Sequence, residues 1–210
     1  MTDPGLGPAA EPGRAPAADA ERPPAAEPGR PPAADAERAL PADAERVPVA
    51  EFDRATVAGA TAALRPCCAA ARWADQLVAG RPYRTLGALA AASDTAIAAL
   101  DWPDIEEALA AHPRIGDRPD GPGRDAAWSR QEQAGTSTAG PGAQAALRSG
   151  NAEYEARFGH VFLICAAGLR ASDMLIALHG RLGHDPAAER EAVRDELRKI
   201  TALRLGKTFR

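Results

Sequence analysis

The sequence has few cysteines and no long hydrophobic run, and each of these shortages excludes a class of protein. Its three cysteines, Cys67, Cys68 and Cys165, are too few and too unevenly spaced for a disulfide framework or a zinc ribbon. A reducing, cytoplasmic setting is therefore expected. No apolar run approaches the ~18–20 residues that a membrane span needs, so no membrane contact is expected. The start of the chain also lacks the basic and apolar segments of a signal peptide.

Charge is balanced over most of the chain. The 210 residues contain 25 Lys and Arg against 29 Asp and Glu, a net charge of −4, and residues 1–46 carry all of it. A neutral remainder without a basic stripe argues against nucleic acid as a partner. Lysine is nearly absent: Lys199 and Lys207 are the two lysines beside 23 arginines. This preference for arginine over lysine, together with abundant Ala, Gly and Pro, is typical of a GC-rich genome and indicates nothing about mechanism.

Residues 1–47 are predicted to form a disordered tail. Ten of the 19 prolines and almost no large apolar side chain fall in residues 1–46, so this stretch cannot bury enough surface to offset the entropy of ordering. A repeat with a period of 16 relates residues 12–27 to residues 28–43. Its units lack the apolar residues of a stacked core, which favours a low-complexity linker, with partner docking as the alternative. Residues 48–210 are expected to form the folded domain.

The folded domain is predicted to be all-α, a compact bundle of about seven or eight helices. Apolar residues recur at helical spacing from residue 48 onward, and no segment alternates long enough for a confident strand. Pro66 is expected in the first turn of a helix that carries Cys67 and Cys68 as buried thiols. The run 161–166 is short and apolar, and periodicity leaves it open as a strand or a buried helix. Other helices are expected over 86–99 (capped by Thr85), 102–111 (capped by Asp101), 125–134, 143–158, 171–183 and 186–205, with loops over 116–124 and 135–142.

Two neighbouring motifs carry side chains suited to chemistry. His112 precedes Pro113, which disfavours helical geometry at residue 112 and holds the histidine stiffly. The alternative is a histidine that bonds the last carbonyls of a helix. In the next helix, Ser129, Glu132 and Gln133 stand at i, i+3 and i+4, so they share one face. That face suits a small polar ligand, and a merely solvated helix face is the alternative.

No metal or nucleotide motif stands out. His179 and His184 are separated by a segment with two glycines and have no carboxylate or cysteine at a familiar ligand offset, which favours structural or surface histidines. The glycines of residues 116–123 lack the Lys-Ser/Thr of a phosphate loop, and no dinucleotide fingerprint or G-x-S-x-G is present.

Four blocks in order carry a resemblance to a known family: residues 112–134, 151–159, 162–165 and 199–205. With these, the chain resembles the OHCU decarboxylases, which act on 2-oxo-4-hydroxy-4-carboxy-5-ureidoimidazoline in urate breakdown. The resemblance covers about 50–210. It implies a compact all-α homodimer without metal or organic cofactor. The implied reaction is loss of CO2 from OHCU to give S-(+)-allantoin.

The resemblance also assigns roles to individual residues. The family's catalytic histidine falls on His112, its glutamate on Glu132 and its substrate-carboxylate arginine on Arg204. One departure is visible, because this chain has His160-Val161 where many members have an aromatic residue and a proline. Substrate-binding positions, including a segment that offers backbone contacts, fall on Pro113, Ser129, Gln133, Val161, Phe162, Leu163, Ile164 and Cys165.

The assigned residue types suit a decarboxylation. Arg204 can hold a planar carboxylate or ring oxygen with two parallel bonds. We expect Glu132 to raise the pKa of His112 and to fix its tautomer. His112 would then either deprotonate the 4-hydroxyl or protonate the new carbanion, and the sequence leaves both open. Ser129 and Gln133 are expected to hold the ureido arm.

Two other functions remain open at this point. A non-catalytic helical interaction domain predicts that His112, Glu132 and Arg204 point apart, whereas an enzyme predicts that they converge on one pocket. A decarboxylase on the same scaffold could also act on a related ureido acid. The C-terminal residues 207–210 do not match a peroxisomal address, so a cytoplasmic location is expected.

Overall fold

The computed structural model describes residues 46–117, 124–137 and 139–210. The predicted tail therefore lies outside the described residues except at Arg46 and Val47, as does most of the predicted loop 116–124. The described residues contain helices and no sheet strand, which confirms the all-α prediction. Their ten helices are α1 (Val49–Arg54), α2 (Val57–Leu64), α3 (Ala71–Ala79), α4 (Leu86–Ala98), α5 (Trp102–Ala110), α6 (Arg124–Glu132), α7 (Ala134–Ser137), α8 (Pro141–Phe158), α9 (Ala171–Arg181) and α10 (Pro186–Thr208).

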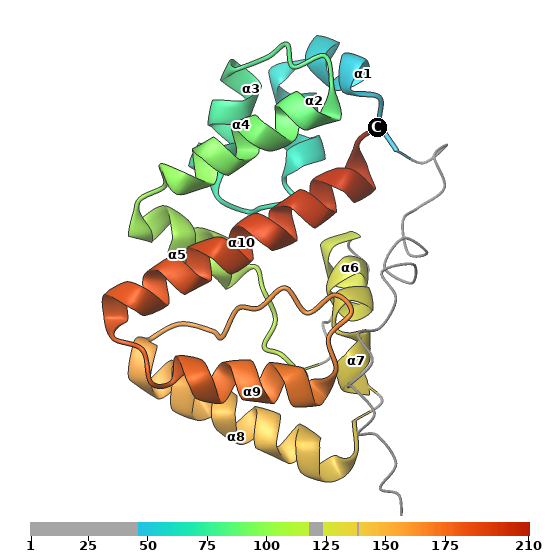
Figure 1. Cartoon of the computed structure of the whole chain (residues 1–210). Helices are drawn as coiled ribbons and strands as arrows, with labels where there is room; N and C mark the ends of the chain where they lie inside the picture. The colour runs from blue at the N-terminus through green and yellow to red at the C-terminus, as the bar shows by residue number, and fades with distance from the viewer. Residues whose placement is uncertain (1–45, 118–123, 138) are drawn as a thin grey trace, which may run out of the picture. The chain divides into compact units, whose positions relative to one another are not determined.

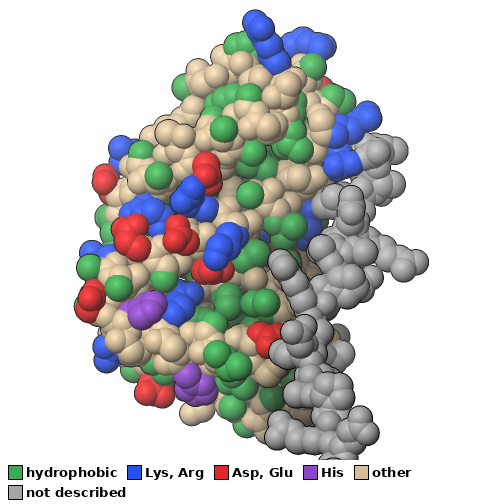
Figure 2. Space-filling model, in the orientation of Figure 1, with side chains coloured by type: hydrophobic (Ala, Val, Ile, Leu, Met, Phe, Trp, Pro, Cys, Tyr) green, Lys and Arg blue, Asp and Glu red, His purple; other side chains and the backbone are tan. Residues whose placement is uncertain are grey.

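The long helix α10 organises the fold. It packs against α4, while α8 and α9 pack side by side as a separate pair (Figure 1). The two ends of the domain meet, because the Val47 N–H donates to the Thr208 carbonyl at 2.8 Å and the Arg210 N–H donates to the Val47 carbonyl at 3.0 Å. Figure 2 shows acidic and basic side chains interleaved over α10. Within the described residues, no helix combines the length and apolar character that a bilayer crossing requires.

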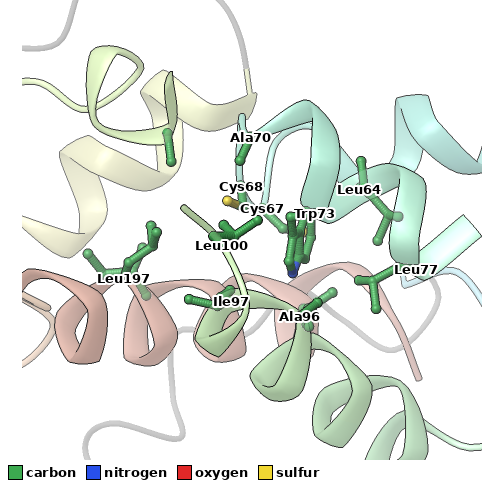
Figure 3. Packing of buried hydrophobic residues seen from close by; sticks show 14 of the residues in the cluster. Leu64, Cys67, Cys68, Ala70, Trp73, Leu77, Ala96, Ile97, Leu100 and Leu197 are labelled. Atoms are coloured by element: carbon green, nitrogen blue, oxygen red, sulfur yellow. The ribbon is translucent and has the colours of Figure 1, made fainter. Parts of the chain in front are cut away.

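Two hydrophobic cores hold these helices together. The first joins α1 to α5 with α10, and Figure 3 shows Trp73, Leu77, Ile97 and Leu197 converging there from α3, α4 and α10. The indole N–H of Trp73 donates to the Ser93 hydroxyl at 3.1 Å, so this buried ring leaves no polar atom unpaired. The second core lies between α8, α9 and the segment 161–166.

Two helix starts follow the predicted caps. The Thr85 hydroxyl accepts from the Ala88 N–H at 3.1 Å and begins α4, as predicted. Asp101 precedes α5, and its N–H donates to the Asp104 carboxylate at 3.2 Å, as in a capping box. Both caps satisfy amides that a helix start leaves without intrahelical partners.

The prediction for Pro66 is wrong. This proline lies in the turn after α2, not in the first turn of a helix, because a proline commonly follows the end of a helix that it cannot continue. Cys67 and Cys68 consequently lie in the connection to α3. Both are buried as predicted. Burial raises the pKa of the Cys67 thiol to about 12 and that of Cys68 to about 11.

Two connecting segments also differ from expectation. The predicted loop 135–142 contains the short helix α7, whose turn is supported by the Thr136 hydroxyl donating to the Gln133 carbonyl at 2.8 Å. The helix α8 begins at Pro141, because proline fits a first helical turn, where amides have no partner. The run 161–166 is neither strand nor helix but irregular backbone that joins α8 to α9.

The start of α10 provides a test of local stability. The Asp185 carboxylate accepts from the N–H groups of Ala187 and Ala188, each at 2.9 Å. We expect Asp185→Ala to lower the free energy of unfolding by about 1 kcal/mol, since it removes this cap. Urea denaturation measures the loss. The control Asp185→Asn retains a capping oxygen and should lose far less; equal losses in both variants would show that the cap is not the cause.

Candidate active site

A small cavity of about 20 Å3, room for roughly one water molecule, lies where the two cores meet. It contains nine of the eleven predicted site residues, including His112, Glu132 and Arg204. Val161 and Cys165 do not line it, and they pack against the first core instead. The complete lining is His112, Pro113, Ile115, Ser129, Glu132, Gln133, Phe162, Leu163, Ile164, Ala166, Ile200 and Arg204.

One ring nitrogen of His112 has no hydrogen-bond partner among the described residues. The residue follows α5, and its Nδ1 lies 2.9 Å from the Ala108 carbonyl oxygen. Since a carbonyl can only accept, Nδ1 carries the proton, and the neutral ring therefore has a lone pair on Nε2. The residue as a whole is half-buried, yet Nε2 itself is enclosed and has no hydrogen-bond partner in the described part of the chain. The ring is thus oriented as a base.

The pKa of His112 is lowered to about 4. Burial is the largest cause, and the positive charge of Arg204 adds to it. The Ala108 bond and the charge of Glu132 act in the opposite direction but are outweighed. Glu132 therefore acts on this pKa in the expected direction, but the expected net rise is wrong because burial dominates. The expectation that Glu132 fixes the tautomer is also wrong, because the Ala108 carbonyl holds Nδ1.

Glu132 is bound by two cations instead. Arg204 Nε donates to Glu132 Oε1 at 3.2 Å, and Arg204 Nη2 donates to Oε2 at 2.9 Å. Lys207 Nζ donates to Oε1 at 3.2 Å, and all three side chains are at most 8% exposed. Arg204 Nη2 also donates to the Ser129 hydroxyl at 3.1 Å. The three charged groups sum to +1, and two of them, Glu132 and Arg204, line the cavity, which favours an anionic ligand there.

Lys207 is the residue that sequence reasoning missed. It lies three residues after Arg204 on α10, and its ammonium sits 5.8 Å from the centre of the Trp128 ring. The sequence contains a signal for Lys207. The chain has two lysines beside 23 arginines, and Lys207 follows the predicted site residue Arg204 at helical spacing. Genome composition explains the arginine bias but not the position of this lysine beside Arg204 on one helix.

Gln133, which directly follows α6, forms a hydrogen bond to the segment after His112. Its Oε1 accepts from the Gly116 N–H at 2.9 Å, and Gly116 has a φ of +89°, a conformation that favours glycine. On the other side of this loop, Asn151 Nδ2 donates to the Ile115 carbonyl at 2.8 Å. The two amide side chains thereby fix the backbone of Ile115 and Gly116, close to Pro113, and Gln133 also lines the cavity.

His179, in α9, and His184, in the connection to α10, have different surroundings. His184 Nδ1 lies 2.9 Å from Glu189 Oε2, while His179 is exposed. Throughout the described residues, no three His, Cys, Asp or Glu side chains gather as a metal ion would require. The structural and surface interpretation of these histidines therefore fits their surroundings.

The depressed pKa of His112 predicts a pH-dependent stability. Between the ordinary value of 6.5 and about 4, the unfolded chain binds a proton at this residue that the folded chain does not. Lowering the pH through that window therefore destabilises the fold, by about 2–3 kcal/mol near pH 4.5, whereas the full contribution is present above pH 6.5. Urea denaturation near pH 7.5 and near pH 4.5 tests this. His112→Asn should lose less stability on acidification, and equal losses would contradict the assignment.

Together, the fold and the cavity define a small all-α protein in which a histidine with an enclosed, unpartnered ring nitrogen, a carboxylate and a guanidinium line one cavity, an arrangement suited to proton transfer on a small polar anion. The interaction-domain alternative predicted that His112, Glu132 and Arg204 point apart, whereas all three line one cavity. A family model described as OHCU decarboxylase matches residues 53–206. The chain belongs to the OHCU decarboxylase family.

Individual relatives agree with this assignment. A 2-oxo-4-hydroxy-4-carboxy-5-ureidoimidazoline decarboxylase of Amia calva is 36% identical over 142 residues, which are 67% of this chain and 78% of the relative. The uric acid degradation bifunctional protein TTL of Arabidopsis thaliana is 33% identical over 147 residues. That match covers 68% of this chain but 45% of the plant protein, so this chain spans less than half of that relative.

Solved structures share the fold. A crystal structure of OHCU decarboxylase in the presence of (S)-allantoin superposes with a TM-score of 0.60 at 29% identity, covering 68% of this chain and 94% of that chain. A crystal structure of (S)-allantoin synthase gives a TM-score of 0.57 at 20% identity, covering 76% of this chain and 53% of that chain. At that identity the second match bears on the fold alone.

Proposed function

We propose that this protein decarboxylates OHCU to S-(+)-allantoin in urate breakdown. The observation that carries the proposal is the unpartnered Nε2 of His112, which shares one cavity with the Glu132–Arg204 pair. Family membership supplies the substrate. An OHCU carboxylate is an anion, and the net charge of +1 on Glu132, Arg204 and Lys207 favours its binding.

The chemistry follows from the charge state of His112. When the bond from C4 to the carboxylate breaks, CO2 leaves and its electron pair forms a C4=C5 double bond. The former C5=N electrons pass to nitrogen, which takes one proton from solvent. The resulting enol still carries the 4-hydroxyl proton. A neutral His112 takes that proton at Nε2 and returns it to C5, which leaves a carbonyl at C4.

A neutral His112 supports an order for the two proton steps that the sequence left open. With a pKa near 4, the ring carries no transferable proton on Nε2 at neutral pH, so it acts first as the base toward the hydroxyl. Because the Ala108 carbonyl holds the ring, the proton reaches C5 from one side. Delivery to a single face accounts for a single enantiomer of allantoin.

Other lining residues are proposed to position the substrate. Ser129 and Gln133 hold the ureido arm, while Pro113 forms part of the wall. Phe162, Leu163 and Ile164 offer backbone contacts, a role that we do not extend to Val161 and Cys165. A cavity of about 20 Å3 is smaller than OHCU, so binding requires these lining side chains to move apart.

We further propose that the protein needs no metal or organic cofactor, forms a homodimer and works in the cytoplasm, all three on the strength of the family resemblance. Sedimentation velocity of the full chain measures the oligomeric state. A single species with twice the chain's mass would support the homodimer, and a monomer at micromolar concentration would overturn it.

The activity is tested with OHCU made freshly from urate by urate oxidase and hydroxyisourate hydrolase. Circular dichroism then follows the appearance of optically active allantoin. The protein should accelerate the reaction and give S-(+)-allantoin, whereas the uncatalysed reaction gives both enantiomers. A racemic product at the uncatalysed rate would overturn the proposal. Turnover of a related ureido acid in place of OHCU would favour the alternative substrate.

A further inference from the structure

One wall of the cavity is an irregular backbone segment held from outside by two charged side chains. Phe162, Leu163 and Ile164 are buried, and buried backbone polar groups require partners. Arg181 Nη1, from α9, donates to the Leu163 carbonyl oxygen at 2.6 Å. Glu196 Oε2, from α10, accepts from the Cys165 N–H at 2.7 Å. The peptide groups on either side of Ile164 are therefore both anchored.

Arg181 is itself firmly placed. It is 8% exposed and is ion-paired with Glu189, which is fully buried. The Tyr154 hydroxyl donates to the same carboxylate, and the Arg181 guanidinium lies 4.8 Å from the centre of the Phe162 ring. The proposed chemistry uses none of these contacts. An arginine held at this many points fixes the direction of the carbonyl that it binds.

The direction of one carbonyl sets the direction of the next N–H. In a trans peptide the C=O and N–H groups point in opposite directions, so an outward Leu163 carbonyl turns the Ile164 N–H away from Arg181. Leu163 and Ile164 both line the cavity. The Ile164 N–H has no acceptor among the described residues. It is a buried donor without a partner, next to the space where a ligand would bind.

We propose that Arg181 is a positioning residue that keeps the Leu163–Ile164 peptide turned so that the Ile164 N–H donates to an oxygen of the bound substrate. This inference rests on the proposed function for the identity of the substrate. If the peptide turned over, it would present the Leu163 carbonyl to the cavity and repel a substrate oxygen. Arg181 therefore acts on the reaction through the backbone and does not touch the substrate.

The kinetic test compares Arg181→Lys with Tyr154→Phe. The lysine keeps a positive charge beside Glu189, but its single ammonium cannot also hold the Leu163 carbonyl, and we expect kcat/KM for OHCU to fall on the order of 10- to 100-fold. Tyr154→Phe removes a bond to Glu189 in the same cluster and leaves the Arg181–Leu163 bond in place. It should lower Tm but leave kcat/KM within about twofold. Wild-type kcat/KM in folded Arg181→Lys, or equal losses in both variants, would overturn the proposal.

A second measurement uses the unmodified protein, so it holds even if Arg181→Lys fails to fold. Titration of (S)-allantoin into protein labelled with 15N should shift the Ile164 amide resonance and leave Cys165, held by Glu196, nearly unchanged. The reverse pattern would overturn the positioning role. Wild-type protein that binds (S)-allantoin through Ile164 yet does not consume OHCU would instead overturn the proposed function alone.

Discussion

Replacing His112 with asparagine should lower kcat for OHCU by about 10²- to 10⁴-fold, the range for loss of a positioned acid–base group. Asparagine is the informative substitution because its side-chain NH2 can replace Nδ1 as the donor to the Ala108 carbonyl. Asparagine has no second nitrogen that could take the place of Nε2. The loss in kcat therefore reports the missing lone pair and not a misplaced loop.

Two readouts separate chemistry from folding in this variant. The Tm of His112→Asn near pH 7.5 should stay close to that of the wild type, since the bond to Ala108 is retained. Circular dichroism of the residual product should show less S-(+)-allantoin, because the proton no longer comes from one side. A variant that keeps the wild-type rate and a single enantiomer would remove His112 from the mechanism.

The second large effect is expected for Arg204→Lys, which should raise KM for OHCU about 10- to 100-fold. The guanidinium holds both oxygens of Glu132 and the Ser129 hydroxyl, and a lysine ammonium cannot reproduce this planar set of bonds. The carboxylate would then shift into the space that a substrate anion should occupy. Steady-state kinetics at several OHCU concentrations separates KM from kcat.

The matched control lies on the same helix. Arg198, on the surface of α10, pairs with Asp94, and neither residue lines the cavity. Arg198→Lys should leave KM unchanged, because an exposed ion pair contributes little. If Arg204→Lys also left KM unchanged, binding of the substrate carboxylate near Arg204 would be rejected.

The sequence predicted those features of the fold that depend only on neighbouring residues. Thr85 and Asp101 cap the helices that they were expected to cap, because a cap needs only the next few backbone amides. Pro66 was misplaced because a proline fits both the start of one helix and the turn after another. The helix α7 was missed because a four-residue turn has no periodicity to detect.

The candidate site was predicted as a set of residues but not as a network. His112, Glu132 and Arg204 line one cavity, yet Glu132 binds Arg204 and Lys207 while His112 binds its own helix. Which cation reaches Glu132 depends on packing between segments 72 to 75 positions apart. The pKa of His112 depends on burial, which no spacing rule reports.

The proposed mechanism depends most on His112 being a neutral base with its proton on Nδ1. Nitrogen-15 NMR of histidine-labelled protein near pH 7 measures this directly, because protonated and lone-pair ring nitrogens resonate at different shifts. We expect a protonated Nδ1 and an unprotonated Nε2 that persist as the pH falls to about 5, since the pKa is lowered to about 4. A His112 ring protonated on both nitrogens near pH 7 would contradict the account.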